Sequence, residues 1–423
     1  MQRLEDSKIA IIGLGYVGLP LAVEFSKKYL TVGYDINKSR VNKLNNGSDS
    51  TFEVDDESLN LALENGLILS NNLESIATSN IYVVTVPTPI DENRAPDLKP
   101  LEKASEMLGA ILKNGDVVIY ESTTYPGCTE DFCVPILESS SKLIYNKDFF
   151  CGYSPERINP GDKKNTLTKI VKVTSGSNSE IAQFVDDLYK SIIEAGTHLT
   201  SSIAVAEASK AIENAQRDVN ISFVNELSLI FDRLDIDTRE VLDAAATKWN
   251  FLNYSPGLVG GHCIGVDPYY LAHKAQTVGY EPQVILSGRR VNDSMGVHVA
   301  STLMKLLISK NIPIKNSKVL ILGITFKENC PDIRNTKIID VINELKEFEI
   351  EVDVYDPNAN REEVKKELGI KLLVDLPETD KYAGIILAVA HKAFKFYTLR
   401  SSPNQVIYDL KGLYKKENVD KRL

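Results

Sequence analysis

Short apolar runs alternate with amphipathic stretches over the first 200 residues. Apolar runs of strand length lie at residues 8–12, 31–35, 81–86 and 116–120. Apolar residues recur at helical spacing over residues 19–28, 101–112 and 130–139. Strands that alternate with helices form βαβ units, in which the strands are parallel. The first half of the chain therefore predicts an α/β domain with a parallel sheet.

The pattern changes near residue 200. Residues 203–233 contain neither Pro nor Gly and carry apolar residues at helical spacing, and further helices are expected at 238–249 and 282–309. A helix of about 31 residues would run ~46 Å at 1.5 Å per residue. Such a length predicts a connection between domains or a dimer interface.

The last third repeats the plan of the start. Residues 318–323 form a strand followed by glycine, 335–348 a helix, and 351–355 a strand that ends in Asp356. More strands are expected at 382–390 and 406–410. We predict an α/β fold with two Rossmann-like doubly wound domains, joined by a long central helix and a helical dimerisation segment. The predicted domains are residues 1–200, 201–312 and 313–423.

Composition agrees with a soluble globular protein of two to three domains, with 423 residues, 43% hydrophobic and 25% charged. The formal net charge of -10 argues against nucleic-acid binding, which needs clustered Lys and Arg. Cysteine spacing is irregular, without a CxxC pair, so no metal site is expected. The five cysteines are Cys128, Cys133, Cys151, Cys263 and Cys330.

The first eight residues are polar and carry both signs of charge, unlike a signal peptide. No apolar run approaches the roughly 18 residues that would span a bilayer. These features predict a cytoplasmic protein without membrane segments and with reduced thiols.

Three glycines mark a phosphate-binding turn. Gly13, Gly15 and Gly18 follow a strand and precede a helix, and Asp35 ends the next strand. In this pattern the glycines allow a tight turn, a close approach to pyrophosphate and close helix packing. Asp35 suits a ribose diol and repels a 2′-phosphate, so the cofactor is predicted to be NAD. Arg40 is expected either to cover the adenine or to be a solvated surface residue.

A glycine-rich loop surrounds one cysteine. Residues 257–270 read GLVGGHCIGVDPYY, with Cys263 between glycines and Asp267 four positions later. Glycines let backbone approach a ligand, and a thiolate is a strong nucleophile. Cys263 is therefore either a nucleophile or a small buried hydrophobe. His262 either tunes the thiol or packs against the turn, and Asp267 could hold a water or a lysine.

Lys210 and Asn214 lie four residues apart on the long predicted helix, hence on one face. Small or apolar neighbours surround Lys210. A buried lysine has a lowered pKa and can act as an acid or a base, whereas a lysine on a helix more commonly points to water.

Six ordered motifs resemble the UDP-glucose/GDP-mannose dehydrogenase family over nearly the whole chain. They are GLGYVGLP at 13–20, TVPTPID at 85–91, ESTTYPG at 121–127, SPERINPGD at 154–162, GGHCIGVDPYYL at 260–271 and TFKENCPDIRNT at 325–336. The resemblance implies oxidation of the C6 alcohol of a UDP-sugar to a carboxylate with two NAD+, in an N-terminal NAD-binding and a C-terminal UDP-binding domain.

The resemblance also implies the catalytic roles. Cys263 carries a thiohemiacetal and then a thioester, while Lys210 and Asn214 stabilise the oxyanion. Asp267 orders the lysine or a water. Thr123 and Glu156 are linked to the hydrolytic water and to proton handling.

Binding residues follow from the same motifs. The cofactor contacts implied are Gly13, Gly15, Tyr16, Val17, Gly18, Asp35, Arg40, Pro87, Thr88, Thr123 and Arg334. The substrate contacts implied are Glu156, Arg157, Lys210, Asn214, Tyr254, Gly260, Gly261, Phe326 and Lys327. Lys411 stands where many relatives have an arginine, whose fork of donors a lysine lacks.

The cysteine loop bears on the sugar. Glucose enzymes typically carry GG-S-C-F-x-K-D, whereas Val266 replaces the lysine here. The motifs look like the branch that oxidises UDP-N-acetylhexosamines for bacterial surface polysaccharides, and Val266 or Tyr254 could form an apolar wall for the N-acetyl group. We expect UDP-N-acetylglucosamine or UDP-N-acetylgalactosamine as the substrate.

Two alternatives remain open at this point: a UDP-glucose or UDP-N-acetylmannosamine 6-dehydrogenase, and a nucleotide-sugar-binding sensor without activity. A homodimer is expected through an apolar face of the long helix. That face comprises Val219, Phe223, Leu227 and Ile230.

Overall fold

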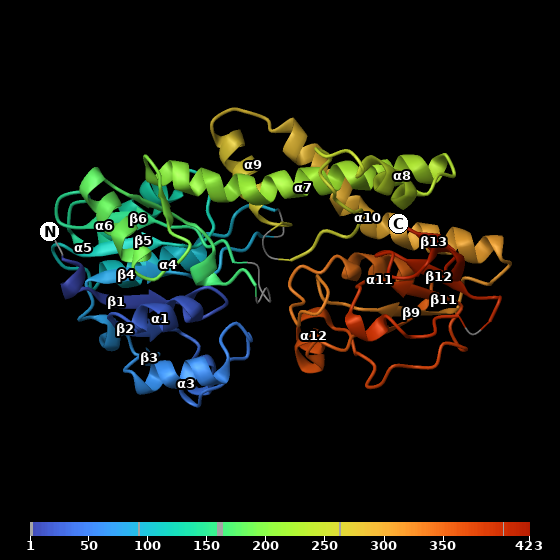
Figure 1. The fold of residues 1–423 in the computed structure, drawn as a ribbon, viewed down its shortest axis with the longest axis horizontal. Coiled ribbons are helices and arrows are strands. Elements are labelled where there is room, and N and C mark those ends of the chain that lie inside the picture. Colours follow the sequence, from blue (N-terminus) through green and yellow to red (C-terminus); the bar gives the residue numbers. More distant parts are fainter. Residues whose placement is uncertain (1–2, 92–93, 159–163, 262–263, 401) are drawn as a thin grey trace. The chain divides into compact units, whose positions relative to one another are not determined.

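The computed structural model describes the chain except residues 1–2, 92–93, 159–163, 262–263 and 401 (Figure 1). Its internal contacts divide the chain into two compact units. The first comprises residues 1–213 and 269–278, and the second comprises residues 214–268 and 279–423. The predicted central segment, 201–312, is thus shared between the two units.

The first unit is built on one sheet, which among the described residues has eight strands in the order β3-β2-β1-β4-β5-β6-β7-β8. Neighbouring strands are parallel except β6 and β7. The first six positions have the strand order of a Rossmann fold. The strands are β1 (Lys8–Ile12), β2 (Leu30–Tyr34), β3 (Ile68–Ser70), β4 (Ile81–Val84), β5 (Val117–Tyr120), β6 (Phe150–Tyr153), β7 (Lys172–Gly176) and β8 (Thr197–Leu199).

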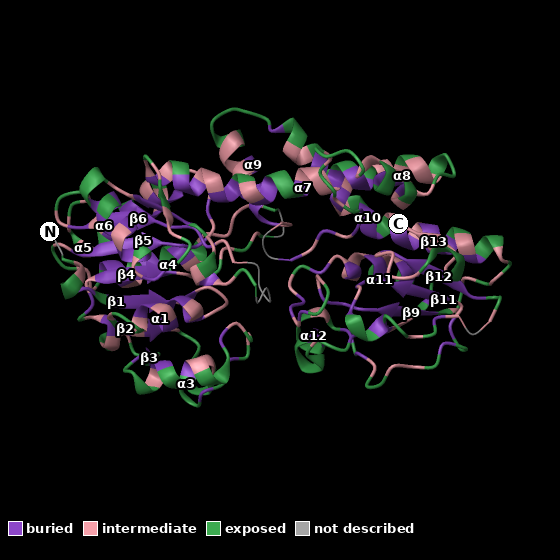
Figure 2. Ribbon diagram, viewed as in Figure 1, coloured by how far each residue is buried: buried purple, intermediate pink, exposed green. Residues whose placement is uncertain are grey.

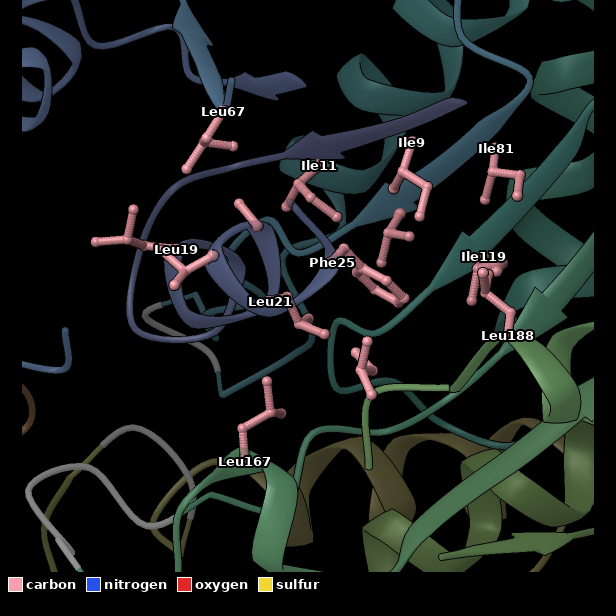
Figure 3. Packing of buried hydrophobic residues seen from close by; sticks show 14 of the residues in the cluster. Ile9, Ile11, Leu19, Leu21, Phe25, Leu67, Ile81, Ile119, Leu167 and Leu188 are labelled. Carbon is pink, nitrogen blue, oxygen red and sulfur yellow. The ribbon is translucent and has the colours of Figure 1, made fainter. Parts of the chain in front are cut away.

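Both faces of this sheet are buried, as the continuous apolar runs of its strands require. On β1, Ile9 and Ile11 belong to one apolar cluster, while Ala10 and Ile12 belong to another. Figure 3 shows the first cluster, where Phe25 of the first helix points toward the strands. That cluster includes residues of α1 (Gly18–Ser26), α2 (Lys38–Asn45), α3 (Asp56–Glu64) and α6 (Ser179–Lys190). The opposite cluster includes residues of α4 (Lys99–Gly109), α5 (Val134–Ser141) and the start of α7 (Ile203–Arg233).

The second unit holds a parallel sheet, with five strands among the described residues in the order β10-β9-β11-β12-β13. Its strands are β9 (Lys318–Leu322), β10 (Glu351–Tyr355), β11 (Gly384–Leu387), β12 (Val406–Asp409) and β13 (Lys421–Arg422). Val319 and Ile321 pack with α10 (Gln283–Ser309) and α11 (Ile338–Glu347). The predicted repeat of the opening plan is confirmed. Over the described residues, the other α-helices are α8 (Thr238–Ala245), α9 (Asp267–Thr277) and α12 (Arg361–Leu368).

The long helix is present with the predicted bounds, Ile203–Arg233. One side is buried, including Lys210, Asn214, Asp218 and Asn225. Other positions along α7 are exposed (Figure 2), and several of them are large apolar residues. Phe223 is 55% exposed and Ile230 44%. The predicted apolar face is therefore only partly covered within one chain.

Among the described residues, no helix combines the length and apolar character needed to cross a membrane. The same part of the chain holds no group of three His, Cys, Asp or Glu side chains arranged for a metal ion.

Candidate active site

The glycine turn of the first unit has the geometry that a pyrophosphate needs. Gly13 has φ of +97°, which favours glycine. A Cβ on Gly18 would lie 1.8 Å from the Gly13 carbonyl oxygen, so only glycine lets α1 pack here. A Cβ on Gly15 would meet no atom within 4 Å. Space therefore remains beside Gly15, at the start of α1, where backbone N–H groups face outward.

Asp35 lies beside this turn at the end of β2. Its carboxylate accepts from the backbone N–H of Leu14 at 2.8 Å and of Asn37 at 2.8 Å. Each oxygen keeps a further lone pair. Because Asp35 is only half-buried, these lone pairs can accept the two hydroxyls of an adenosine ribose. The residues present thus fit NAD.

Arg40 does not behave as a solvated surface residue, so that alternative is wrong. Its Nε donates to the Leu14 carbonyl at 2.9 Å, and its guanidinium lies 2.7 Å from Asp49. Only 10% of the side chain is exposed. Arg40 fastens the glycine turn to the loop after α2.

The second unit repeats the glycine turn, but its Asp356, which corresponds to Asp35, is already hydrogen-bonded within the protein. Asp356 accepts from the backbone N–H groups of Ile324 at 2.7 Å and Asn358 at 2.8 Å, and its Oδ2 lies 3.1 Å from His391 Nε2. His391 Nδ1 accepts from Asn329 N–H, so Nε2 carries the proton that reaches Asp356. Burial raises the pKa of Asp356, but His391 and the backbone donors bring it below its usual value. The carboxylate is occupied, so dinucleotide binding favours the first unit.

Four expected cofactor contacts line the loops of the first unit. Tyr16, Val17 and Thr88 are half-buried, and Pro87 is exposed. Tyr16 and Val17 lead into α1, whereas Pro87 and Thr88 follow β4. The neighbouring Thr85 donates to the carbonyls of the glycine turn, which ties the two loops together.

Thr123 follows β5 in a turn that a buried carboxylate holds. Glu207 on α7 accepts from Thr129 N–H at 2.8 Å, from the Thr129 hydroxyl at 2.7 Å and from Gly127 N–H at 2.5 Å. Burial raises the pKa of Glu207 to about 7. This carboxyl links the turn with Thr123 to the helix with Lys210.

Glu156 follows β6 and is 8% exposed. Its Oε1 accepts from the N–H of Arg157 at 2.6 Å and of Ile158 at 2.7 Å. Its Oε2 lies 2.9 Å from the ammonium of Lys172, which also contacts Glu121 at 2.7 Å. Both carboxylate oxygens are thus engaged within the first unit.

Arg157 is also engaged. Its guanidinium donates to the Val171 carbonyl at 2.9 Å and pairs with Glu213 of α7 at 2.8 Å. These contacts hold the chain after β6 against α7. Exposure of about a third of each side chain leaves the pair accessible to a ligand.

Lys210 and Asn214 are each 7% exposed on α7, so the solvated alternative for Lys210 is wrong. The Asn214 side-chain amide donates to Asp267 at 2.5 Å. Asp267 is buried and opens α9. The structure therefore brings the Asn214 amide and the Asp267 carboxylate together. His262 and Cys263 lie outside the described residues.

The loop before Cys263 is anchored from inside the second unit. Asn225 of α7 donates to the Gly257 carbonyl at 3.0 Å and accepts from Gly257 N–H at 2.8 Å. A Cβ on Gly260 would lie 2.7 Å from the Asn335 carbonyl, and one on Gly261 would lie 2.9 Å from the Phe326 ring. The glycines are thus required by close packing on the loop after β9.

A pocket in the second unit collects several of the expected substrate contacts. Its lining includes Gly260, Phe326, Lys327, Lys337 and Lys411. Burial lowers the pKa of Lys411. Three lysines beside an aromatic ring suit a nucleotide diphosphate, with the ring for the base and the cations for phosphate.

Arg334 and Tyr254 are not among the residues that line this pocket. Arg334 pairs with Asp332 two residues earlier, at 2.6 Å. Tyr254 is half-buried, while Val266 is only 2% exposed.

Sequence reasoning missed Glu121, Lys172, Glu207 and Asn225. Glu121 stood inside a recognised motif, but Lys172 opens a short strand with polar members, KVTSG, and gives no clear signal. Asn225 and Glu207 are polar residues within a helix and carry no comparable signal. The four other cysteines are buried, as expected for structural thiols.

Three domain models of one family match this chain in order. They are the UDP-glucose/GDP-mannose dehydrogenase family NAD binding domain at residues 7–193, central domain at 204–294 and UDP binding domain at 320–416. These matches agree with the division into a cofactor-binding and a nucleotide-binding sheet.

Full-length relatives agree. The chain is 56% identical to the UDP-N-acetyl-D-glucosamine 6-dehydrogenase of Pseudomonas aeruginosa, over 99% of this chain and 100% of the relative. It is 54% identical to the enzyme of the same name in Salmonella typhi, over 100% of both chains. The solved UDP-D-ManNAc dehydrogenase of Pyrococcus horikoshii has a TM-score of 0.88 at 28% identity, with 98% of each chain covered. The chain therefore belongs to the UDP-glucose/GDP-mannose dehydrogenase family and is an NAD-dependent oxidoreductase that acts on UDP-sugars.

Proposed function

We propose that this enzyme oxidises the C6 alcohol of UDP-N-acetylglucosamine to the uronic acid. The observation that carries the proposal is the 56% identity over 99% of the chain to a UDP-N-acetyl-D-glucosamine 6-dehydrogenase. Val266 in place of a lysine supports an N-acetylated sugar, because that side chain is apolar and buried. The uronic acid would serve the synthesis of a bacterial surface polysaccharide.

Cys263 is the proposed covalent residue. The C6 alcohol first gives up a hydride from C6 and its hydroxyl proton, which leaves an aldehyde. The thiolate of Cys263 then adds to the C6 aldehyde, a C–S bond forms, and the aldehyde oxygen takes up a proton. Loss of a second hydride from C6 and of the hydroxyl proton gives the thioester. Water then adds to the thioester, the C–S bond breaks, and the carboxylate leaves while the thiolate is restored. NAD+, when bound, supplies the hydride acceptor in each oxidation.

Lys210 and Asn214 are the proposed partners of the C6 oxygen. Both are buried on α7, and Asp267 accepts from Asn214, which orients the amide. A low-dielectric setting strengthens a cation or an amide donor directed at an oxyanion. Thr123 is proposed beside the reacting carbon, and Glu156 in the handling of the hydrolytic water.

The cofactor is proposed to lie along the glycine turn. The pyrophosphate would face the N–H groups near Gly15, and Asp35 would accept the ribose hydroxyls. Tyr16, Val17, Pro87, Thr88 and Thr123 would line the remainder. Arg40 would act by holding the turn.

The UDP moiety is proposed to occupy the pocket of the second unit. Phe326 would contact the uracil, and Lys327 the phosphates. Gly260 and Gly261 would let the backbone approach, while Arg157 and Tyr254 would contact the substrate further along. Lys411 would replace the arginine of many relatives near the sugar.

A homodimer is proposed through the exposed face of α7, with a second copy as the occupant. Val205, Ile212 and Phe223 are each exposed by 47–55%. Their spacing is seven and eleven residues, which keeps them on one stripe of the helix. Two such stripes would cover one another in an antiparallel or parallel pair.

The test is NADH formation with a panel of UDP-sugars. We expect UDP-N-acetylglucosamine to be oxidised with the highest kcat/KM, ahead of UDP-N-acetylgalactosamine, UDP-N-acetylmannosamine and UDP-glucose. Turnover of UDP-glucose alone would overturn the proposed sugar. Binding of a UDP-sugar without any NADH formation would favour the sensor alternative.

A further inference from the structure

A buried lysine outside the family motifs, Lys172, gathers two carboxylates that belong to them. Lys172 opens β7 and is 3% exposed. Glu121 follows β5 and is 1% exposed, and Glu156 follows β6. β7 runs antiparallel to β6, so its first residue lies at the carboxyl edge of β5 and β6. Ligands of open α/β sheets bind outside this edge.

Each charged group of the cluster has a partner within the first unit. The Lys172 ammonium lies 2.7 Å from Glu121 and 2.9 Å from Glu156, and 5.4 Å from the centre of the Tyr189 ring. The other Glu121 oxygen accepts from the Tyr189 hydroxyl of α6. The other Glu156 oxygen accepts from two backbone N–H groups. One cation is therefore shared between two carboxyls.

This arrangement carries more carboxyls than cations, which is costly in a dry interior. Protonation of one carboxylate would remove the excess negative charge and lower this cost. Burial, opposed by Lys172 and aided by the charge of Glu156, raises the pKa of Glu121 to about 7. Burial lowers the pKa of Lys172, but the two carboxylates hold it above its usual value.

Both side-chain oxygens of Glu156 are engaged by the protein. Its three contacts fold the chain at 156–158 into a turn, and Arg157 in that turn donates to the carbonyl of Val171, next to Lys172. Two contacts therefore join this turn to the start of β7: the Lys172–Glu156 ion pair and the hydrogen bond from Arg157 to Val171. Movement of Lys172 would displace both Glu156 and Arg157.

We propose that Lys172 is a positioning residue for UDP-sugar oxidation, which holds the Glu156–Arg157 turn against the Thr123 turn, and that Glu121 sets how firmly it does so. With Glu121 protonated, the ammonium pairs with Glu156 alone. With Glu121 ionised, the ammonium is divided between two carboxylates, and the Glu156 turn is held less tightly. This inference rests on the proposed use of Glu156 and Arg157 at the site.

The test is the NADH assay with four variants, each with its thermal midpoint. Lys172→Met is expected to lower kcat about 100-fold, the scale of a misplaced catalytic group. It also leaves two unpaired carboxyls, so its midpoint falls. Glu121→Gln combined with Lys172→Met removes one of them. We expect the double variant to regain stability without regaining kcat, whereas a merely structural role predicts that both return. Lys169→Met, an exposed lysine of the same segment, should match the wild type.

Glu121→Gln alone keeps the shape and hydrogen bonds of the side chain and is expected to fold. Its profile of kcat against pH should coincide with that of the wild type below about pH 6 and diverge above about pH 7, since only the wild type ionises there. Identical profiles at every pH, or wild-type kcat in folded Lys172→Met, would overturn the inference. If the wild type oxidises another UDP-sugar instead, the proposed sugar is wrong. The same variants are then assayed with that sugar, and the inference about Lys172 is still tested.

Discussion

Gly15 and Gly18 lie three positions apart in the glycine turn, and each is required for a different reason. Gly18 is demanded by the protein itself, because a Cβ would overlap the Gly13 carbonyl. Gly15 is not, because a Cβ would enter empty space. The empty space is where the motif places a pyrophosphate, so the two glycines should respond differently to the same substitution.

Gly18→Ala is expected to lower the stability of the protein by roughly 1–3 kcal/mol, as overpacking does. Gly15→Ala should leave the thermal midpoint unchanged and raise KM for NAD about tenfold, a loss of ~1.4 kcal/mol in binding. Thermal melts without NAD and initial rates with varied NAD measure the two effects. A Gly15→Ala enzyme with the wild-type KM would contradict the cofactor placement.

Asn214 pairs with Asp267 inside the second unit, and its amide is proposed to face the C6 oxygen. Asn214→Ala is expected to lower kcat about 100-fold, the loss that follows removal of one oxyanion donor. Asn220→Ala is the matched control, since Asn220 donates only to the Gln216 carbonyl on the same helix. Equal kcat values for the two variants would remove Asn214 from the proposed mechanism.

At the scale of elements, strong periodicity predicted most of the structure. The long helix has its predicted bounds, and the first strands of both sheets were expected within one residue. The strands β3, β6, β7, β8 and β13 were not expected, because two to five residues are too few to give a clear alternation. Lys172 in β7 shows why, since its burial depends on carboxylates from two distant segments.

Elements are also joined by single buried groups, as with Glu207 between α7 and the turn at 124–129. Its pKa is 4.5 in the unfolded chain and about 7 in the fold. The folded state therefore favours the protonated form, and its advantage is lost as pH rises through about 7. A shift of this size corresponds to up to ~3 kcal/mol.

Glu207→Gln should flatten the dependence of stability on pH. We expect the free energy of unfolding to fall less between about pH 5 and pH 8 in the variant than in the wild type. Below about pH 5 the variant should be less stable by ~1 kcal/mol, since an amide cannot accept every bond that the carboxyl does. Urea unfolding at several pH values measures both. A parallel pair of curves would rule out ionisation of Glu207 in this range.

At the scale of the whole molecule, two sheets of related topology match different binding domains, one for NAD and one for UDP. Their resemblance was visible as a repeated strand, glycine turn, strand and Asp. The sequence alone could not predict that His391 hydrogen-bonds to Asp356, because the two residues are 35 positions apart. Nor could it assign Glu156 its neighbours. Site residues within motifs were predicted, whereas those that support them from other elements were not.

The exposed stripe of α7 leads to a prediction about assembly. Phe223→Glu should convert a dimer into a monomer. The interface would bury the new carboxylate without an opposite charge, which costs free energy. Arg217→Glu, at an exposed position of α7 outside that stripe, should leave the mass unchanged. Light scattering at micromolar concentration gives the mass. A monomeric wild type would contradict the proposed dimer.

The central claim is that one active site carries out both oxidations through Cys263. The most direct measurement is the number of NADH formed per UDP-N-acetylglucosamine consumed, for the wild type and for Cys263→Ser. We predict two NADH per sugar for the wild type and a loss of steady turnover in Cys263→Ser, because a serine hydroxyl is a far weaker nucleophile than a thiolate. One NADH per sugar with released aldehyde, or a Cys263→Ser enzyme near the wild-type rate, would contradict the account.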